Sequence, residues 1–395
     1  MVEVAAEDYQ QIGEFMPSPS ADTVALLKDL VKIESVNPSL SPRGSGEQRV
    51  AEYLERFCRD RNLPCELQHV VDGRSNFLTW ISGKDPSRRL LFVAHMDTVP
   101  TDNWASDPFS PELKDNRLYG RGSCDTKGSL SAMMIAVSTL GDRQPNATIV
   151  VAASIDEEYR KIGARAIALS GKSYDAAVVG EPTELELVVA HKGSVRWQIE
   201  VQGVPAHTSK PHLGVNAISG MAKVILALNE HGENLASRTQ PLVSPPTLTV
   251  SLIEGGLELT TVPPSCRIWV DRRLVPGERP EQALAEVENI LQGLRDREDI
   301  NVRSLLPALE DPAPDSAESS KIASVAAQAC AEVAGTGKYI GVPYGTDASQ
   351  LSLAGIPCIV LGPGSIDRAH TNNEFIELDQ LERSVEIYRR IMLSY

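Results

Sequence analysis

The chain has 395 residues and a formal net charge of −15 at pH 7, and 42% of its residues are hydrophobic. This length indicates two domains, or one domain with a large insertion. The acidic balance argues against nucleic acid and anionic membrane surfaces as partners, and no apolar run approaches the ~20 residues needed to span a bilayer.

The cysteines and the N-terminal segment indicate the cellular compartment in which we expect the protein. The six cysteines form no Cys-x-x-Cys pair, so a structural zinc knuckle is not expected. Residues 1–20 are acidic and lack the basic segment and apolar run of a secretory signal. Scattered thiols without a signal sequence are typical of the reduced cytoplasm, so we expect a cytoplasmic protein.

The first part of the chain alternates helices and loops. We expect residues 1–20 to form a loosely held arm. Apolar residues at helical spacing predict helices over 20–33 and around 50–57. A strand is predicted over 76–81, and a loop rich in Pro, Ser and Gly lies at 38–46.

The stretch LLFVAHMD, residues 90–97, combines a strand with polar chemistry. Its five leading apolar residues indicate a buried strand that ends at His95. Residues two apart in a strand face the same way, so Asp97 is placed to hold the imidazole of His95. A carboxylate behind a histidine orients a metal-ligating imidazole. One His-x-Asp pair alone is weak evidence for a metal site, and an ordinary polar pair at a strand end is the more common explanation.

Three further apolar strands end at acidic residues or at a loop that carries a histidine. They are 147–155, ending at Asp156-Glu157-Glu158; 176–179, ending at Gly180-Glu181-Pro182; and 358–361, followed by a glycine-rich loop and His370. Strands that alternate with helices predict an α/β fold with a parallel sheet. Ligands of such sheets bind at the carboxyl ends of the strands, where these polar residues are.

The pattern changes between residues 189 and 301. The segment 194–201 alternates polar and apolar residues, as a half-exposed strand does. The elements that follow are a helix at 215–228, strands at 247–253 and 265–273, a helix at 280–294 and a strand at 300–305. Their order, βαββαβ, is the ferredoxin-like arrangement. We therefore predict an inserted domain over 189–301 and a catalytic domain formed by 1–188 and 302–395.

The candidate metal ligands are two histidines and three carboxylates: His95, Asp125, Glu158, Glu181 and His370. This set fits two metal ions if one carboxylate is shared, and such mixed shells suit Zn²⁺ and, less tightly, Co²⁺ or Mn²⁺. Asp125, a short side chain in a glycine-rich turn, is the natural bridge. Two metals about 3.5–4 Å apart lower the pKa of a shared water to about 7.

Such a water still needs a base to accept its proton. Glu157, beside Glu158, is placed for that role and for passing the proton to a leaving amine. The alternative is that residues 156–158 form a solvated acidic turn, because runs of charge usually lie on the surface. Their position directly after a buried strand favours the catalytic interpretation.

Six motifs, taken together, resemble the co-catalytic zinc amidohydrolases. That family includes acetylornithine deacetylase, succinyl-diaminopimelate desuccinylase, aminoacylase and glutamate carboxypeptidase. The motifs are His95-Met96-Asp97, GRGSCDTKG at 120–128, Glu157-Glu158, Gly180-Glu181-Pro182-Thr183, GVPAHTS at 203–209 and AHTNNE at 369–374. The resemblance covers about 20–395. It implies a mixed, mainly parallel sheet flanked by helices, with an inserted ferredoxin-like lid and dimerisation domain.

The resemblance also implies roles for the ligands. One zinc is implied to be held by His95 and Glu181, and the other by Glu158 and His370, with Asp125 as the bridge. The peptide after Asp125 is implied to be cis.

Four further residues receive roles from the same resemblance. Asp97 is implied to orient His95, and Glu157 to be the general base. His207 is implied to donate to the developing oxyanion, from the other subunit in dimeric members, so a homodimer is expected. Arg273, in Asp271-Arg272-Arg273, is the candidate clamp for a substrate carboxylate.

One position departs from the family pattern. Members often carry Asn shortly before the segment seen here as Val262-Pro263, whereas this chain has Thr260-Thr261. A hydroxyl offers fewer hydrogen-bond donors than an amide, so we do not assign that substrate contact.

The segment 362–370 resembles the acetylornithine deacetylase branch most, and Glu181 favours acylated or carboxylate-bearing substrates. We therefore predict hydrolysis of the amide bond of an N-acyl-L-amino acid, with N-acetyl-L-ornithine as first candidate. A desuccinylase and a dipeptidase or carboxypeptidase of the same family are alternatives, as is a binding protein that has lost catalysis. The expected partners are a small-molecule substrate and a second copy of the chain.

Overall fold

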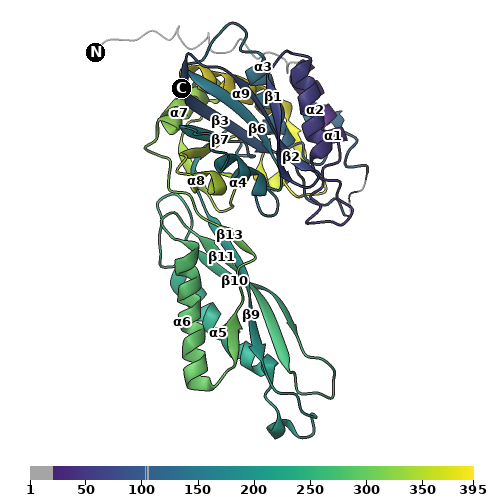
Figure 1. Cartoon of the computed structure of the whole chain (residues 1–395), viewed down its shortest axis with the longest axis vertical. Helices are drawn as coiled ribbons and strands as arrows, with labels where there is room; N and C mark the ends of the chain where they lie inside the picture. The colour runs from purple at the N-terminus through teal and green to yellow at the C-terminus, as the bar shows by residue number, and fades with distance from the viewer. Residues whose placement is uncertain (1–20, 103, 105) are drawn as a thin grey trace, which may run out of the picture.

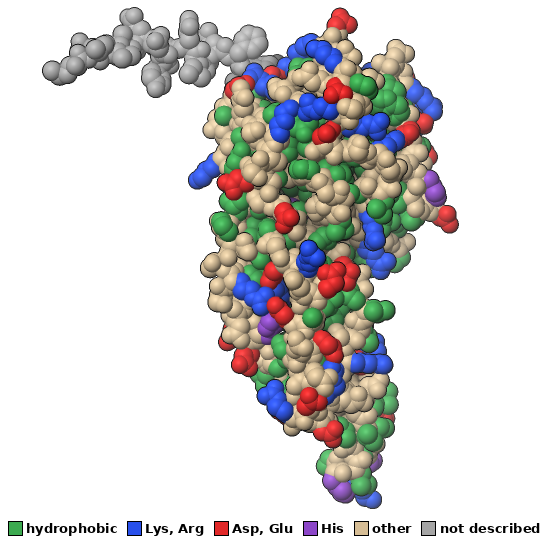
Figure 2. Space-filling model, turned by 60° about the vertical axis from the view of Figure 1, so that its left-hand side comes forward, with side chains coloured by type: hydrophobic (Ala, Val, Ile, Leu, Met, Phe, Trp, Pro, Cys, Tyr) green, Lys and Arg blue, Asp and Glu red, His purple; other side chains and the backbone are tan. Residues whose placement is uncertain are grey.

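The computed structural model describes residues 21–102, 104 and 106–395; the predicted N-terminal arm, residues 1–20, lies outside the described part. The molecule is elongated, with a large domain at one end and the inserted domain at the other (Figure 1). Basic and acidic side chains are interspersed over both domains on the face shown in Figure 2. Among the described residues, no helix combines the length and apolar character that a bilayer span requires.

The large domain is built on an eight-stranded mixed sheet with the order β1-β2-β6-β3-β7-β15-β8-β14. Its strands are β1 (Cys65–Val71), β2 (Arg74–Ile81), β3 (Asp85–His95), β6 (Ala147–Ser154), β7 (Ala176–Val179), β8 (Leu187–His191), β14 (Tyr339–Val342) and β15 (Cys358–Val360). The adjacent strands β6, β3, β7 and β15 are parallel. These are the four strands predicted to end at site residues, so the mainly parallel sheet is confirmed.

Helices cover both faces of this sheet, which explains why the buried parts of its central strands are mainly apolar. They are α1 (Ala21–Lys32), α2 (Gln48–Arg59), α3 (Lys127–Ser138), α4 (Ile162–Ala168), α7 (Lys321–Ala334), α8 (Ala348–Ser352) and α9 (Leu378–Ser394). On β3, Leu90 and Phe92 face the cluster that contains α1, α3 and α9. Leu91 and Val93 face the cluster that contains α8. Alternate residues thus enter separate cores, as the pleat requires.

A small three-stranded sheet, which the sequence did not predict, lies in the same domain. It has the order β16-β5-β4 and consists of β4 (Glu112–Lys114), β5 (Arg117–Tyr119) and β16 (Phe375–Glu377). The pairing of Phe375 with Tyr119 places the segment after His370 beside the turn that leads to Asp125. Two parts of the predicted site, about 250 residues apart in the chain, are thereby joined.

The inserted domain has the predicted βαββαβ order. Its elements are β9 (Gly193–Gln202), α5 (Ala217–Leu235), β10 (Thr247–Gly255), β11 (Ser265–Leu274), α6 (Pro280–Glu298) and β12 (Val302–Ser304). The sheet order is β10-β11-β9-β12, and β13 (Leu309–Asp311) also pairs with β9. The sheet therefore uses residues beyond position 301. Inward residues of β11, such as Ile268 and Val270, pack against α5 and α6.

The two connections between the domains pass against each other at Gly193. A Cβ on this residue would lie 2.3 Å from the backbone nitrogen of Ala313 and 2.3 Å from the carbonyl oxygen of Asp311. Only glycine permits so close an approach of two backbones. The entry and exit of the inserted domain are therefore packed as one junction.

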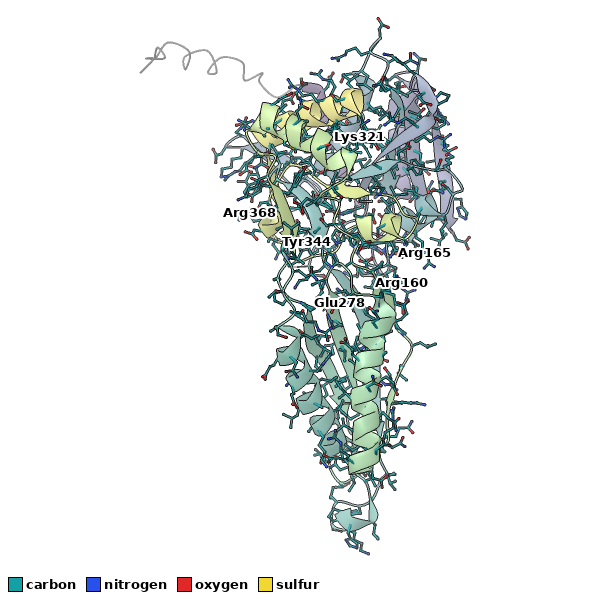
Figure 3. The ribbon with its side chains drawn as sticks, turned by 90° about the vertical axis from the view of Figure 1, so that its left-hand side faces the viewer. Arg160, Arg165, Glu278, Lys321, Tyr344 and Arg368 are labelled. Carbon is teal, nitrogen blue, oxygen red and sulfur yellow. The ribbon has the colours of Figure 1, made fainter. Side chains whose placement is uncertain are left out.

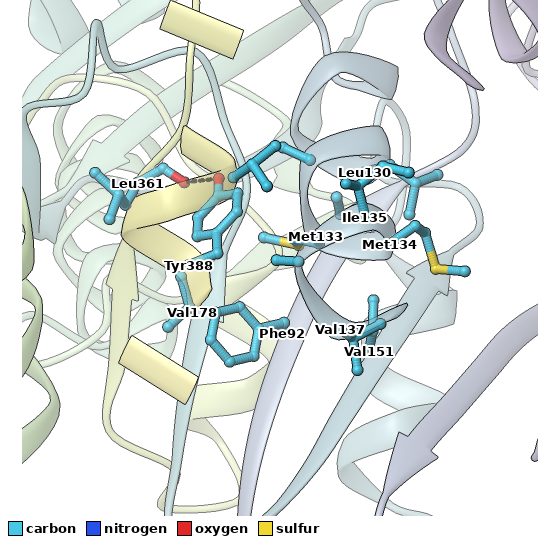
Figure 4. Packing of buried hydrophobic residues seen from close by; sticks show 14 of the residues in the cluster. Phe92, Leu130, Met133, Met134, Ile135, Val137, Val151, Val178, Leu361 and Tyr388 are labelled. Carbon is cyan, nitrogen blue, oxygen red and sulfur yellow. Dashed lines mark hydrogen bonds between the residues drawn. The ribbon is translucent and has the colours of Figure 1, made fainter. Parts of the chain in front are cut away.

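A packing contact in the large domain fixes the segment that leads to His370 (Figure 4). The rings of Phe92 and Tyr388 pack edge to face, with centroids 5.8 Å apart. The Tyr388 hydroxyl is buried and donates to the carbonyl of Leu361 at 2.7 Å. Helix α9 is thereby attached to the chain that leaves β15.

We expect the replacement Tyr388→Phe to lower the free energy of unfolding by about 1–2 kcal/mol. The ring packing is kept, but the buried carbonyl of Leu361 loses its donor. Urea denaturation of the purified protein measures the change. The matched control is Tyr339→Phe on a partly exposed ring of β14, with an expected change below about 0.5 kcal/mol. Equal stability of Tyr388→Phe and the wild type would contradict the role given to this hydrogen bond.

Candidate metal centre

The carboxyl ends of four neighbouring parallel strands converge on one site. His95 is the last residue of β3, and Glu158 follows β6 by four residues. Glu181 comes two residues after β7, and His370 lies in the loop after β15. Asp125 lies in the turn before α3. Because these strands are adjacent in the sheet, side chains from five separate segments meet at the edge where α/β sheets bind ligands.

Asp125 lies between the two histidines. Its Oδ1 is 3.0 Å from Nε2 of His95, and its Oδ2 is 3.2 Å from Nε2 of His370. Glu181 Oε2 lies 4.0 Å from the same His95 nitrogen, and Glu158 Oε2 lies 3.1 Å from the His370 nitrogen. The five predicted ligands thus form two groups that share one carboxylate: His95, Asp125 and Glu181, and Asp125, Glu158 and His370.

The donor chemistry of these groups fits two divalent cations. In each group the candidate ligand atoms lie within 4.8 Å of one another. Nδ1 of His95 lies 2.9 Å from the carbonyl oxygen of Asp97. An N–H donated there leaves the lone pair of Nε2 directed at Asp125 and Glu181, which is the tautomer a metal ligand needs. The peptide bond after Asp125 is cis, as predicted.

The charge of the site also indicates a need for cations. Hydrogen bonds with Asp125 and Glu158 raise the pKa of His370 to about 11. Burial, followed by the charge of Asp125, raises the pKa of Glu158 to about 7. Burial and nearby carboxylates also raise the pKa of Glu181 well above its usual range. Buried carboxylates in this number are stable as anions only beside compensating positive charge.

One side of the site is open. The side chain of His95 is 1% exposed, whereas that of His370 is 55% exposed. A substrate therefore reaches the pair of groups from the side of His370.

Asp97 contacts the site differently from the prediction. Its carboxylate Oδ1 is 3.6 Å from Nδ1 of His95, and the shorter contact to that nitrogen is made by the Asp97 carbonyl. The carboxylate instead accepts hydrogen bonds from the backbone nitrogens of Glu157 and Glu158, at 3.0 and 3.1 Å. Asn37 also donates to it at 2.8 Å. Asp97 therefore holds the backbone of the two glutamates, and its main chain holds His95.

Glu157, the predicted base, lies next to the second ligand group and is 8% exposed. Its Oε1 is 3.3 Å from Nζ of Lys161. The interpretation of residues 156–158 as a solvated acidic turn does not describe Glu157, because burial and this ion pair hold its carboxylate inside the protein.

Two predicted residues are not beside the metal ligands of their own chain. His207 is exposed, bonded to Ser209, and paired with Thr261 in a segment at the end of the inserted domain far from the large domain (Figure 1). Arg273 lies at the other end of β11, opposite Ser194 near the junction, and its Nε is 2.9 Å from Asp271. No described contact joins either side chain to the two ligand groups.

The sequence matches peptidase family M20/M25/M40 over residues 91–394. An acetylornithine deacetylase of Vibrio campbellii (strain ATCC BAA-1116) is 31% identical over 373 residues, which cover 92% of this chain and 95% of that protein. The chain belongs to peptidase family M20/M25/M40. A second relative, an acetylornithine deacetylase of Vibrio parahaemolyticus serotype O3:K6, is 30% identical and covers 92% of this chain and 95% of that protein. The protein is a metal-dependent amidohydrolase of this family.

Solved structures share the fold at low identity. A tripeptidase from Staphylococcus aureus has a TM-score of 0.78 and is 20% identical, covering 94% of this chain and 97% of that one. A metallo-carboxypeptidase from Sulfolobus solfataricus has a TM-score of 0.74 and is 19% identical, covering 94% of this chain and 98% of that one. These similarities show that the M20 fold extends over both domains.

Sequence reasoning gave no role to Glu374, which organises the turn of Asp125 in this M20 protein. The buried carboxylate accepts hydrogen bonds from the backbone nitrogens of Gly122, Cys124 and Asp125 at 2.9–3.0 Å. Arg121 donates to it at 2.7 Å. The signal available in the sequence was the position of Glu374, four residues after His370, but its partners become evident only when the small sheet forms.

We expect Glu374→Gln to lower the content of bound divalent metal, because the amide nitrogen of Gln faces backbone N–H groups that need an acceptor. The loss of affinity should be about 10- to 100-fold, as for other residues that orient metal ligands. Metal analysis after dialysis against limiting zinc measures it. The matched control, Glu377→Gln, changes a partly exposed carboxylate paired with Arg117. Full metal content in Glu374→Gln would contradict the role given to Glu374.

Proposed function

We propose that the protein is a two-zinc deacylase of N-acyl-L-amino acids, with N-acetyl-L-ornithine as its substrate. The observation that carries the proposal is the placement of Asp125 between His95 and His370, each of which has a second carboxylate beside it. The relatives named acetylornithine deacetylase support the choice of substrate. Co²⁺ or Mn²⁺ is expected to substitute for zinc. The six free cysteines support a reducing, cytoplasmic location.

The reaction adds water to an amide. The two ligand groups would hold two cations, which would supply the acidity of a bound water molecule and the polarisation of the substrate carbonyl. Glu157 accepts the proton that the attacking water loses as its oxygen bonds to the carbonyl carbon. Glu157 then delivers this proton to the amide nitrogen as the C–N bond breaks. The products are a carboxylate, acetate for an acetyl substrate, and the free amino acid.

Groups of the inserted domain complete the site. We propose that Arg273 binds the substrate carboxylate, because a guanidinium matches a carboxylate in a two-point contact and because Arg273 lies near the junction. We propose that His207 donates to the oxyanion from a second copy of the chain, since no described contact joins it to the ligand groups of its own chain.

We expect Glu157→Gln to lower kcat for release of acetate from N-acetyl-L-ornithine by about 10²- to 10⁴-fold. Metal content and KM should change little, since Glu157 is not a ligand. Acetate release by the zinc-loaded wild type and variant, with and without a chelator, tests the requirement for Glu157 and the requirement for metal. Glu318→Gln, at an exposed carboxylate, is the control variant.

The choice of N-acetyl-L-ornithine as substrate is tested separately, by comparing rates of hydrolysis of several substrates. A panel with N-succinyl-diaminopimelate, acyl-glutamates and dipeptides separates the proposed deacetylase from the family alternatives. Hydrolysis that survives chelation, or that persists in Glu157→Gln, is incompatible with the mechanism. Faster turnover of another panel member would move the assignment to that substrate. A metal-loaded protein inactive on the whole panel would leave only a binding role.

A homodimer is supported by the surface of the inserted domain. Strand β10 is an edge of its sheet, and Leu252 and Ile253 on it are 60% and 56% exposed. Hydrophobic side chains also appear on the surface of this domain in Figure 2, and Leu226 on α5 is 68% exposed. An apolar edge strand without cover is a template for pairing with another chain. A two-fold axis beside β10 would make that partner a second copy.

Mixing two inactive variants tests whether His207 acts across the dimer. His207→Ala and Glu157→Gln each lack one group, but a mixed dimer contains one site in which both groups are intact. We expect refolded equimolar mixtures to recover about a quarter of the wild-type sites, because half of the dimers are mixed. Acetate release from N-acetyl-L-ornithine measures the recovery. A mixture as inactive as its components would place His207 in the site of its own chain or in none.

A further inference from the structure

The turn that carries the two glutamates also contains a buried lysine. Residues 156–161 form a tight turn after β6. The turn is closed by a hydrogen bond of 2.6 Å from the backbone N–H of Lys161 to the carbonyl oxygen of Asp156. Lys161 has φ of +56°, a conformation that glycine adopts without steric cost. Its side chain is nevertheless only 11% exposed, while the neighbouring Arg160 and Arg165 are exposed at the domain junction (Figure 3). A buried lysine thus occupies a backbone position that glycine would adopt more easily.

The ammonium group of Lys161 joins two buried carboxylates. Its Nζ lies 3.3 Å from Oε1 of Glu157 and 3.3 Å from Oδ2 of Asp311. Burial alone would lower the pKa of Lys161, but Glu157 and Asp311 hold that pKa above its ordinary value. The group thus stays a cation. The contact that holds Glu157 is made through its Oε1.

The second partner of Lys161 lies at the junction between the domains. Asp311 is 1% exposed and ends β13, where it is paired with Ser194 of β9. Gln350 donates to its other oxygen, Oδ1, at 3.1 Å. The Asp311 carbonyl is one of the backbone groups that would collide with a side chain at Gly193. Asp311 is therefore fixed where both connections to the inserted domain meet.

We propose that Lys161 is a positioning residue for hydrolysis: it holds the carboxylate of Glu157 in place and attaches it to the domain junction through Asp311. The inference rests on the proposed role of Glu157 as the base. Lys161 does not touch substrate or metal, and it acts through Glu157. The ammonium group of Lys161 is itself held by two buried carboxylates, so it restricts the side chain of Glu157 more than a lysine with one partner would. A base displaced by about 1 Å loses much of its catalytic effect.

The main test is Lys161→Met in the zinc-loaded full chain. We expect kcat for N-acetyl-L-ornithine to fall about 10- to 100-fold, with KM within about twofold and metal content unchanged. Lys161→Arg should recover most of the lost kcat, because it restores a cation between the carboxylates. Arg165→Met, which removes an exposed charge from α4, is the matched control and should behave as the wild type.

A double variant separates positioning from general damage. If Lys161 acts through Glu157, then Lys161→Met in the Glu157→Gln background should cost less than about threefold in kcat. A loss as large as in the wild-type background would show that the lysine supports the fold only, and would overturn the inference.

A crystal structure of zinc-loaded Lys161→Met gives a readout that does not depend on turnover. We expect the Glu157 carboxylate to move or to occupy several positions, with the five ligands unchanged. An unmoved Glu157 overturns the inference. If Lys161→Met does not fold, Asp311→Asn takes its place: it keeps the Lys161–Glu157 pair, and a kcat equal to that of the wild type overturns the attachment to the junction.

The outcomes distinguish this inference from the proposed function. An active Glu157→Gln removes the base assignment, and the role of Lys161 with it. An inactive Glu157→Gln together with a fully active Lys161→Met removes only the positioning role.

Discussion

The site depends on the sharing of one buried carboxylate between two imidazoles. Asp125 places one oxygen at each histidine, while Glu158 and Glu181 add two more buried carboxylates. Removing so much negative charge from water is costly unless positive charge is brought in. The histidines alone can supply it only when protonated, as the pKa of about 11 for His370 shows. Two divalent cations would compensate the buried negative charge equally well and would leave the histidines neutral. The crowding of carboxylates that is unfavourable without metal is therefore what favours metal binding.

Two of the loops that carry candidate ligands are each held by a carboxylate from a distant segment. Asp97 accepts the backbone nitrogens of Glu157 and Glu158, and Glu374 accepts those of Gly122, Cys124 and Asp125. Several N–H groups directed at one anion stabilise its charge, and at Glu374 the guanidinium of Arg121 adds a cation at 2.7 Å. The loops are therefore fixed by groups that do not compete with metal for the ligand side chains. Such support positions ligands before the metal arrives, which reduces the cost of ordering them on binding.

The parts of the molecule that could be predicted are those encoded by local pattern. Continuous apolar runs located β3, β6, β7 and β15, and polar residues after them located four of the five candidate ligands, because a parallel sheet brings such ends together. The fifth, Asp125, was located by its glycine-rich turn before α3. Strands β13 and β16 are three residues long, too short to show a period, and they form by pairing with distant partners. The role of Asp97 was predicted only in part, since a main-chain carbonyl can replace a side chain as acceptor and leaves no sequence signal. The partners of Lys161 and Glu374 depend on the same long-range pairing.

The division of the catalytic groups between domains follows from what each group has to do. Metal ligands must be in place before the reaction, and strand ends of a packed sheet provide that rigidity. Groups that stabilise the transition state act only after substrate has entered, so they can be carried on a separate domain that approaches later. His207 and Arg273, for which we propose such roles, are on the inserted domain, whereas Glu157 is in the turn that follows β6. A base that acts with groups from the other domain must keep its place relative to the junction, and the contact from Lys161 to Asp311 provides a direct physical link between them.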